Sequence, residues 1–510
     1  MEAETIERAA GANLETPSEQ ATRCHDVPRH LASFYHLNRV PVAGKFCNGT
    51  ACFVARHLNR RRWAEAEQQE SRIYCVGQCF AAPAVAVEHA RPYMEVRARH
   101  GVVLGRLIHG PTRTLQSYAS LSGYKALEQA LDLSPGEIVE TIEDSGLRGR
   151  GGAGFPTGRK WRALLAQSSP ERHIIANADE GDPGAYIDKY LLEDDPFAVL
   201  EGMTIAARAT GARHGWIYLR AEHPQAKPIL ETAIAEARAA NLLGEHILRS
   251  DFSFDIQVVM GRGSYICGEE TALIRSMEGK RPEAQARPPL PTERGLFGQP
   301  TVVNNVETLV NIPWIILHSA AAFHAFGFSQ SRGTKVLSLN SLFRSPGLYE
   351  VEFGDPVQSI VDDLGGGLRT GSLKGLIIGG PLAGVIPPHL LETPLGFEEL
   401  RAIGASVGHG GVIAFNEHTS IPELVHHVFS FGGYESCGKC TPCRLGSRRV
   451  EQIFSQISKN GGADYWDEVE FAEITAALHA TSLCGLGTGL AEFAESILRY
   501  YGKELEPCFR

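Results

Sequence analysis

The sequence predicts an α/β protein of several domains, and three observations point to that class. Its 510 residues are enough for roughly three or four domains with buried cores of their own. From about residue 121 to residue 332, helical patterns alternate with short apolar runs, which is typical of a largely parallel sheet covered by helices. Residues 416–510 are patterned as helices throughout. The segments 1–120 and 333–415 show neither the alternating pattern of residues 121–332 nor the helical pattern of residues 416–510.

The composition is that of a globular protein, with 43% hydrophobic and 21% charged residues. A net charge of −10 argues against nucleic acid or an anionic membrane as a partner. The first residues, MEAETIERAAG, lack the apolar run of a signal peptide. The most apolar region, 306–328, is interrupted by Glu307, Pro313, His318 and His324, which indicates a buried helix pair rather than a membrane span. We expect a cytoplasmic protein without membrane insertion.

Eleven cysteines are many for a cytoplasmic chain, in which disulfides are rare. Eight of them form two groups of four, which indicates metal ligands rather than bridges. The first group has the spacings C-x4-C and C-x3-C and consists of Cys47, Cys52, Cys75 and Cys79. Soft thiolates in two local pairs favour an iron–sulfur cluster, with zinc as the alternative. Residues 73–76 and 84–87, around the second pair, have the pattern of short strands.

A glycine-rich stretch, RGRGGAGFPTGRKW at residues 148–161, is the first candidate site in the alternating region. Glycine lets the backbone approach a ligand closely and supplies positive φ, so several N–H groups can face one anion. Arg148, Arg150, Arg159 and Lys160 frame the glycines and can neutralise a phosphate. The stretch matches neither the P-loop nor a G-x-G-x-x-G that closes a strand, so a plain loop stays open as an alternative.

Carboxylates follow the apolar runs of the same region. The alternating pattern includes the segments 137–145, 173–178, 215–219 and 254–259. Ligands gather at the carboxyl ends of strands in parallel sheets, and polar segments at 174–186 and 258–273 occupy such positions. They contain five candidate site carboxylates: Asp179, Glu180, Asp182, Glu269 and Glu270. Turn and helix N-cap positions are the alternative role for these residues.

The last two segments differ from each other. Residues 333–415 contain KVLSLNS, GLYEVEF and LKGLIIGGP, short strands bounded by glycine and proline, which suggest a small β-rich or β-grasp module used for packing and spacing. Residues 416–510 hold the second cysteine group: Cys437, Cys440, Cys443 and, after 40 intervening residues, Cys484. Three close cysteines with one remote cysteine describe a 4Fe–4S site, whereas zinc sites usually come as two pairs. The isolated Cys24, Cys267 and Cys508 are interpreted as structural or incidental.

Five segments occur in the order found in one known family: RGRGGAGFPTGRKW, NADEGDPG, SYICGEETAL, PTVVNNVETL and ESCGKCTPCRLG. From about residue 124 to the C-terminus, the chain resembles the flavin- and NADH-binding subunit of respiratory complex I and the diaphorase subunits of NAD-linked hydrogenases and formate dehydrogenases. The two N-terminal cysteine pairs look like the thioredoxin-like 2Fe–2S subunit that partners this family, here fused to it. The resemblance implies four units: a thioredoxin-like domain (1–120), a Rossmann-like FMN and NADH domain (121–332), a β-grasp module (333–415) and a helical 4Fe–4S bundle (416–510).

The resemblance also implies site residues. FMN would contact Gly149, Gly151, Gly152, Lys160, Asn177, Asp179, Glu180, Tyr265, Gly268, Glu269, Asn304 and Asn305. NADH would stack over the flavin near Phe155 and Glu270, with Asp182 and Arg287 close to the nucleotide. Hydride transfer to a flavin needs no acid or base from the protein, so Glu180 and Glu270 are expected to position rather than to catalyse.

Three departures from the family qualify these expectations. Asp182 stands where members usually have a glutamate that repels the 2′-phosphate of NADP, so NAD(H) is expected to be preferred with measurable use of NADP(H). Arg287 and Leu290 replace a lysine and a phenylalanine, and Leu290 removes an aromatic surface for stacking. Cys52 and Cys75 are separated by 22 residues, fewer than in relatives, although all four ligands of the 2Fe–2S cluster are present.

The function implied is that of a diaphorase, an NADH dehydrogenase component that moves electrons between NAD(H), FMN and iron–sulfur clusters. The fused N-terminal domain and the absence of further ferredoxin motifs favour the beta subunit of a soluble NAD-dependent formate dehydrogenase. A hydrogenase diaphorase subunit and the complex I subunit are the alternatives, and a cluster scaffold without flavin is a fourth. The expected partner is a catalytic subunit with further iron–sulfur clusters, together with a small 2Fe–2S subunit in some arrangements.

Overall fold

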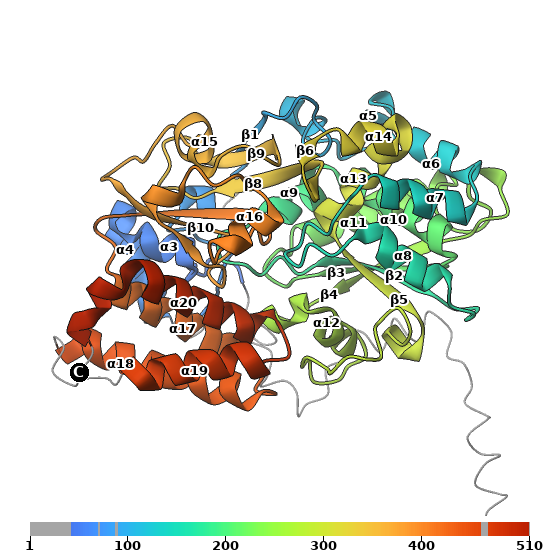
Figure 1. Cartoon of the computed structure of the whole chain (residues 1–510). Helices are drawn as coiled ribbons and strands as arrows, with labels where there is room; N and C mark the ends of the chain where they lie inside the picture. The colour runs from blue at the N-terminus through green and yellow to red at the C-terminus, as the bar shows by residue number, and fades with distance from the viewer. Residues whose placement is uncertain (1–41, 70–71, 87–89, 461–467, 509–510) are drawn as a thin grey trace, which may run out of the picture.

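The described structure contains two large β-sheets, a short two-stranded sheet, helices around them and a C-terminal group of helices (Figure 1). The computed structural model describes residues 42–69, 72–86, 90–460 and 468–508, so Cys24 lies outside the described residues. One sheet has four strands in the order β4-β3-β2-β5, and the other has six in the order β1-β9-β8-β12-β10-β11. Among the described residues, no helix combines the length and the apolar character needed to cross a membrane.

The four-stranded sheet is parallel throughout, as the alternating pattern predicts. Its strands are β2 (His173–Ala178), β3 (His214–Leu219), β4 (Asp255–Met260) and β5 (Thr301–Asn305). The helices that follow these strands are α9 (Ile187–Asp194), α10 (Pro196–Thr210), α11 (Ala226–Ala239), α12 (Glu270–Met277) and α13 (Val306–His318). In this register the carboxyl ends of the strands meet at one edge, which brings the following loops together.

Residues 137–145 lie mostly in a helix, α7 (Pro135–Asp144), rather than in a strand. A capping box starts α7: Ser134 Oγ accepts from Glu137 N at 3.3 Å, and Glu137 Oε2 accepts from Ser134 N at 2.8 Å. These bonds satisfy N–H groups that the first helical turn leaves free. The region 306–328 forms α13 and α14 (Ala320–His324), the expected helix pair.

The six-stranded sheet confirms the strands expected in residues 333–415. They are β8 (Thr334–Leu339), β9 (Gly347–Glu352), β10 (Leu373–Ile378), β11 (Val385–Ile386) and β12 (Gly411–Asn416). The sheet also contains β1 (Tyr93–Val96), which pairs in parallel with β9. Buried Glu350 on β9 explains this join, because its carboxylate accepts N–H groups from Val102 at 2.8 Å, Val103 at 3.0 Å and Leu104 at 2.8 Å. The stretch after the N-terminal cysteines therefore packs with this sheet.

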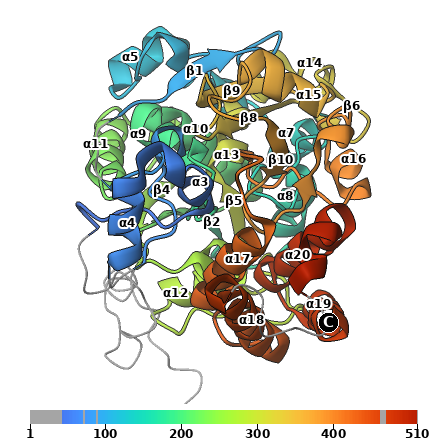
Figure 2. The same ribbon diagram turned by 90° about the vertical axis from the view of Figure 1, so that its left-hand side faces the viewer.

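The N-terminal cysteine segment consists of loops and two helices, α3 (Thr50–Val54) and α4 (Arg60–Gln68). Both are blue in Figure 2, and α3 packs on β12 and on α17 (Ile421–Glu435). Among the described residues of 73–76 and 84–87, the expected strands do not form, apart from a single bridge between Val85 and Phe46. Separate backbone bonds, from Asn48 N to Ile73 O at 2.8 Å and from Cys47 N to Ala84 O at 3.0 Å, take the place of a continuous ladder. Side-chain bonds add to them, because Ile73 N also donates to Asn48 Oδ1 at 3.3 Å.

The C-terminal region is helical, as expected, and is coloured orange to red in Figure 1. After α17 it contains α18 (Ser447–Asn460), α19 (Glu468–Thr481) and α20 (Gly485–Leu505). Helix α17 packs against α18 and α20, and α19 packs against α20. The group brings the loop that follows α17 next to the start of α20, so the two parts of the second cysteine group lie together.

One fully buried ion pair joins the two sheets. Lys335 on β8 and Glu307 on α13 are both 0% exposed, and Lys335 Nζ donates to Glu307 Oε2. The other carboxylate oxygen of Glu307 accepts from Val336 N at 2.9 Å. Each charge is removed from water, so each depends on the other for its stabilisation.

Lys335→Met should therefore leave Glu307 as a buried carboxylate without its cation. We expect the free energy of unfolding, measured by denaturation in guanidinium chloride, to fall by about 3–5 kcal/mol. Lys227→Met is the matched control, because Lys227 is 37% exposed and lies 3.6 Å from the exposed Glu231; its loss should stay below about 1 kcal/mol. Equal effects of the two substitutions would contradict the role given to Lys335.

Candidate functional site

Two adjoining cavities lie at the carboxyl edge of the parallel sheet. We call them the Lys160 cavity, of about 790 Å³, and the His409 cavity, of about 690 Å³. Their shared lining includes Gly151, Asn177, Gly268, Glu269, Asn305 and Cys484. Every residue that the sequence predicts to bind FMN or NADH lines one cavity or both. The structure thus brings together segments that are far apart in the chain.

The glycine-rich stretch forms a bare backbone wall between α7 and α8 (Thr157–Leu165). A Cβ atom on Gly151 would lie 2.9 Å from Asn305 Cβ, and Gly152 has a φ of 124°. Larger side chains would collide or strain the loop at these positions. Gly149 N donates to Phe155 O at 2.9 Å and closes the loop on itself. The wall is therefore shaped for close approach of a ligand.

Two of the four cations around the glycines do not serve the cavity. Arg148 donates to Gly154 O at 2.6 Å and pairs with Glu398 at 2.7 Å, while buried Arg150 donates to Arg332 O at 2.7 Å. Both hold the loop in place, which corrects the expectation that they neutralise a phosphate. Arg159 and Lys160 do line the Lys160 cavity. Counting charges along the sequence could not separate these roles.

Two cations of the Lys160 cavity, Lys160 and Arg287, are paired with carboxylates. Lys160 Nζ lies 2.9 Å from Glu270 Oε2 and 3.1 Å from Val303 O. Arg287 pairs with Glu269 and, at 3.1 Å, with Glu270 Oε1. Burial would raise the pKa of Glu270, but Lys160 and Arg287 bring that pKa below its ordinary value. An incoming phosphate would meet two cations already held in position by two carboxylates.

Two of the five candidate carboxylates cap helices, which is the alternative role that the sequence left open. Glu180 accepts N–H groups at the start of α9 from Ile187 at 2.6 Å and from Asp188 at 3.0 Å. Glu269 accepts from Thr271 N and Ala272 N at the start of α12, both at 3.0 Å. These bonds fix where both side chains stand in the cavity wall.

Asp179 and Asp182 differ from the capping residues. Asp179 Oδ2 is buried without a hydrogen-bond partner among the described residues, and burial raises the pKa of Asp179 well above its ordinary value. Such an orphaned atom beside a cavity is what a missing polar ligand would satisfy. Asp182 Oδ1 accepts from Tyr265 OH at 2.6 Å. The expected use of NADP(H) through Asp182 stays a prediction.

Neighbouring groups hold the side chains of Asn304 and Asn305 in place. Trp161 Nε1 donates to Asn304 Oδ1 at 2.9 Å. Asn305 Oδ1 accepts from Thr308 N at 3.1 Å at the start of α13, and its amide donates to Asp188 Oδ2 at 2.5 Å. Asn177 donates to Gly268 O at 2.8 Å and so ties the β2 loop to the loop before α12. The predicted amide residues thus form a rigid polar lining.

The C-terminal cysteines meet at the edge of both cavities. Cys437, Cys440 and Cys443 lie in the turn after α17, and Cys484 immediately precedes α20 and lines both cavities. Leu483 N donates to Cys440 Sγ at 3.3 Å, and Ser436 Oγ is 3.2 Å from Cys443 Sγ. Donors that face sulfur stabilise the thiolates of iron–sulfur ligands, so these residues fit a 4Fe–4S cluster.

The N-terminal cysteines also fit a cluster. Cys75 Sγ and Cys79 Sγ are 3.7 Å apart, close to the roughly 3.8 Å expected for two sulfurs on one tetrahedral metal with bonds of about 2.3 Å. Three thiols face backbone donors, from Gly49 N to Cys47 at 3.3 Å, from Gly77 N to Cys75 at 3.4 Å and from Ala84 N to Cys52 at 3.4 Å. Cys75 Sγ also contacts Ala185 O at 3.5 Å, in the loop that carries Asp182.

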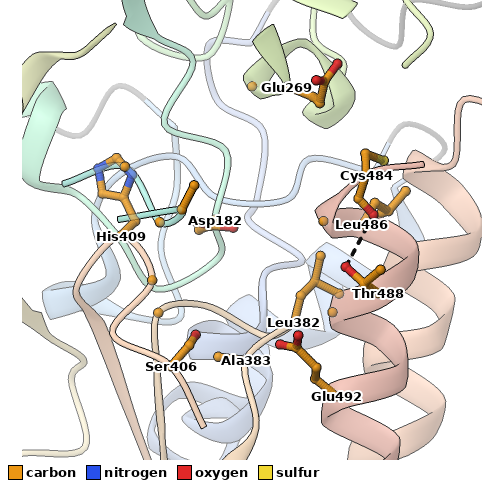
Figure 3. Close-up of a pocket in the computed structure, with 18 of the residues that line it drawn as sticks. Asp182, Glu269, Leu382, Ala383, Ser406, His409, Cys484, Leu486, Thr488 and Glu492 are labelled. Atoms are coloured by element: carbon orange, nitrogen blue, oxygen red, sulfur yellow. Dashed lines mark hydrogen bonds between the residues drawn. The ribbon is translucent and has the colours of Figure 1, made fainter. Parts of the chain in front are cut away.

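Residues 333–415, which the sequence predicts to serve only packing and spacing, also form a wall of the His409 cavity. This finding corrects that expectation. Residues 379–409 and α20 bound the far side of the His409 cavity (Figure 3). Figure 3 places His409 and Asp182 opposite Cys484, Leu486 and Thr488. Asp188 and His409 are cavity residues that sequence reasoning missed. A histidine between glycines and an acidic residue inside a helix carry no spacing signal that could have identified them.

Comparisons with known proteins agree with this site. Residues 142–314 match the Nuo51 FMN-binding domain, and residues 423–508 match the NADH-ubiquinone oxidoreductase-F iron-sulfur binding region. The chain is 41% identical over 394 residues to the HndC subunit of the NADP-reducing hydrogenase of Solidesulfovibrio fructosivorans, covering 77% of this chain and 80% of that protein. It is 36% identical over 418 residues to the F subunit of the NADH-quinone oxidoreductase of Aquifex aeolicus, covering 82% and 96%.

A solved structure covers the whole chain. The NAD+-reducing [NiFe]-hydrogenase in its H2-reduced state contains a chain with a TM-score of 0.78 and 29% identity, with 100% of this chain and 90% of that chain covered. The two matched regions contain the glycine-rich stretch and the C-terminal cysteines, respectively. The chain therefore belongs to the family of FMN- and NADH-binding, 4Fe–4S-carrying subunits of oxidoreductase complexes that includes the F subunit of NADH-quinone oxidoreductase.

Proposed function

We propose that the chain is the diaphorase subunit of a cytoplasmic NAD-linked formate dehydrogenase. In this role it passes electrons between NAD(H), FMN, its 4Fe–4S cluster and a catalytic partner subunit. The main support is that Cys484, a predicted ligand of the 4Fe–4S cluster, lines both cavities. A cofactor held in these cavities would border the cluster site, so electrons could pass between them without crossing solvent.

The cavity residues have separable roles in this proposal. FMN, when bound, accepts a hydride from NADH and releases electrons one at a time. Gly151 and Gly152 allow its close approach, while Lys160, Asn304 and Asn305 offer donors to its phosphate and ribityl chain. Glu180 and Glu270 position the reactants. Phe155 and Leu290 are 48% and 45% exposed on the lining of the Lys160 cavity and provide apolar surface for a nucleotide base.

Hydrogen is the second candidate for the electron donor. The full-length likeness to a chain of the NAD+-reducing [NiFe]-hydrogenase favours it. The formate assignment rests on the resemblance of the fused N-terminal cysteine segment to those of soluble diaphorases, a segment that the likeness to the hydrogenase chain also spans. In both cases the partner is a catalytic subunit with further iron–sulfur clusters, joined in some arrangements by a small 2Fe–2S subunit. The finding that distinguishes the candidates is the identity of the partner.

The complex purified through this chain should reduce NAD+ when formate is supplied and should contain a formate-oxidising subunit. Mass spectrometry of the purified complex identifies the partners, and the rising absorbance of NADH follows the reaction. Hydrogen-driven reduction without formate-driven reduction would replace the first candidate by the second. Reduction of an artificial acceptor by NADH tests the diaphorase step alone.

Gly151→Val should remove FMN, because the new side chain would enter the space beside Asn305. We expect flavin content and NADH:acceptor activity to fall at least tenfold, while the visible spectrum of the 4Fe–4S cluster persists. Gly136→Val is the matched control, since no heavy atom lies within 4 Å of a Cβ at Gly136. Full flavin content in Gly151→Val would contradict the proposed placement of FMN.

Cys75→Ser tests the proposed N-terminal 2Fe–2S cluster. Iron and acid-labile sulfide should fall from about six to about four atoms of each per chain, because a 2Fe–2S centre needs four cysteine ligands. Flavin content and the signal of the 4Fe–4S cluster should be retained. An unaltered count near four in both the parent chain and the variant would show that the N-terminal thiols hold no such cluster.

A further inference from the structure

A buried histidine stands between two carboxylates in the wall of the His409 cavity. His409 Nε2 lies 3.2 Å from Glu180 Oε1 and 3.1 Å from Asp188 Oδ2. The three side chains are at most 7% exposed, and all three residues line the cavity. They come from the loop before β12, the loop after β2 and helix α9, so only the folded chain brings them together. Figure 3 shows the His409 ring beside Asp182.

This geometry selects the charged form of the ring. Burial by itself would lower the pKa of His409, but Asp188 and Glu180 raise it well above its ordinary value. The same contact helps to hold the pKa of Glu180 below its ordinary value in spite of burial. Burial raises the pKa of Asp188, whereas His409 lowers it, so the ring and the two carboxyl groups each favour the charged form of the other. Both carboxylates face the same ring nitrogen, so the positive charge of the ring, rather than a hydrogen bond to each oxygen, compensates the pair.

Further charged groups surround these three side chains. Asp188 faces Glu307 on α13, which is paired with Lys335 on β8, and Arg150 below the glycine-rich stretch faces the same glutamate. Asp182 is the third carboxylate near His409, and burial raises the pKa of Asp182. His409, Lys335 and Arg150 thus face four acidic side chains, and Arg220 is a further cation that lowers the pKa of Asp182. His409 is the cation of this set that lines the His409 cavity itself.

An imidazolium, rather than a metal ion, suits this position. Glu180 Oε1 already accepts N–H groups from Ile187 and Asp188, and Asp188 Oδ2 already accepts the amide of Asn305. The oxygens nearest to His409 are therefore engaged by donors. The histidine adds a positive charge beside these oxygens without donating a hydrogen bond to either of them.

We propose that His409 is a positioning residue that sets the reduction potential of the flavin through the charge of the cavity wall. The inference rests on the proposed placement of FMN in these cavities. Reduction of a flavin adds electrons to a site of low dielectric, where a nearby cation stabilises the reduced form and an uncompensated carboxylate destabilises it. Loss of His409 should therefore make the bound flavin harder to reduce.

The test uses the full chain with its cofactors and measures the flavin midpoint potential by spectroelectrochemical titration. In His409→Gln, the ratio of reduced to oxidised flavin at a fixed potential should fall at least tenfold, about 30 mV for a two-electron couple. His409→Lys keeps a cation and should stay within about threefold of the parent chain, which a role in ring packing would not predict. His418→Gln, at a histidine 67% exposed, is the matched control and should change nothing.

Asp188→Asn provides the opposite change and a rescue. Alone it removes one negative charge, so the flavin should become easier to reduce. Combined with His409→Gln it restores the net charge of the group, and the potential should return toward the parent value. The inference is overturned if His409→Lys shifts the potential as far as His409→Gln, or if Asp188→Asn fails to raise it. FMN content, measured for each variant, separates this failure from a failure of the proposed FMN site, which Gly151→Val tests.

Discussion

The arrangement of the molecule depends on a set of buried charges that lies between its two sheets. Glu307 on α13 pairs with Lys335 on β8, and His409 before β12 stands between Glu180 and Asp188. Buried ions are stable only when each is compensated, so displacing one of these elements would leave a charge without its partner. The same constraint that orients the two sheets therefore also defines one wall of the His409 cavity.

Around this charged centre, both cysteine groups contact the cavity walls. Cys484 lines both cavities, and Cys75 contacts the loop that carries Asp182. Cys484 directly precedes α20, where backbone N–H groups are free to face sulfur or a ligand, whereas Cys75 lies in a loop and contacts a backbone carbonyl. The carboxyl edge of the parallel sheet, the start of α20 and the N-terminal cysteine loop thus converge on one region, which is the arrangement that electron transfer between successive centres requires.

Several residues of this region have two physical roles. Glu180 and Glu269 cap helices and line the cavities, and Asn305 caps α13 while contacting Asp188. Capping removes the rotational freedom of these side chains, so a ligand would meet donors and acceptors that are already oriented. The choice between a structural and a functional role for such residues, which the sequence leaves open, is therefore not exclusive: the cap supplies the rigidity that the site needs.

The sequence by itself determined the features that depend on local spacing. Apolar runs predict the parallel strands, cysteine spacing predicts two cluster sites, and the glycines around Gly151 predict a backbone wall, because each pattern acts over a few residues. The tertiary structure alone decided which residues meet across the chain. The pairing of β1 with β9 depends on Glu350 and Val102, 248 positions apart, and the inward turn of Arg150 depends on Arg332, 182 positions away. Charge compensation and burial determine these contacts, and both depend on distance in space rather than on separation along the chain.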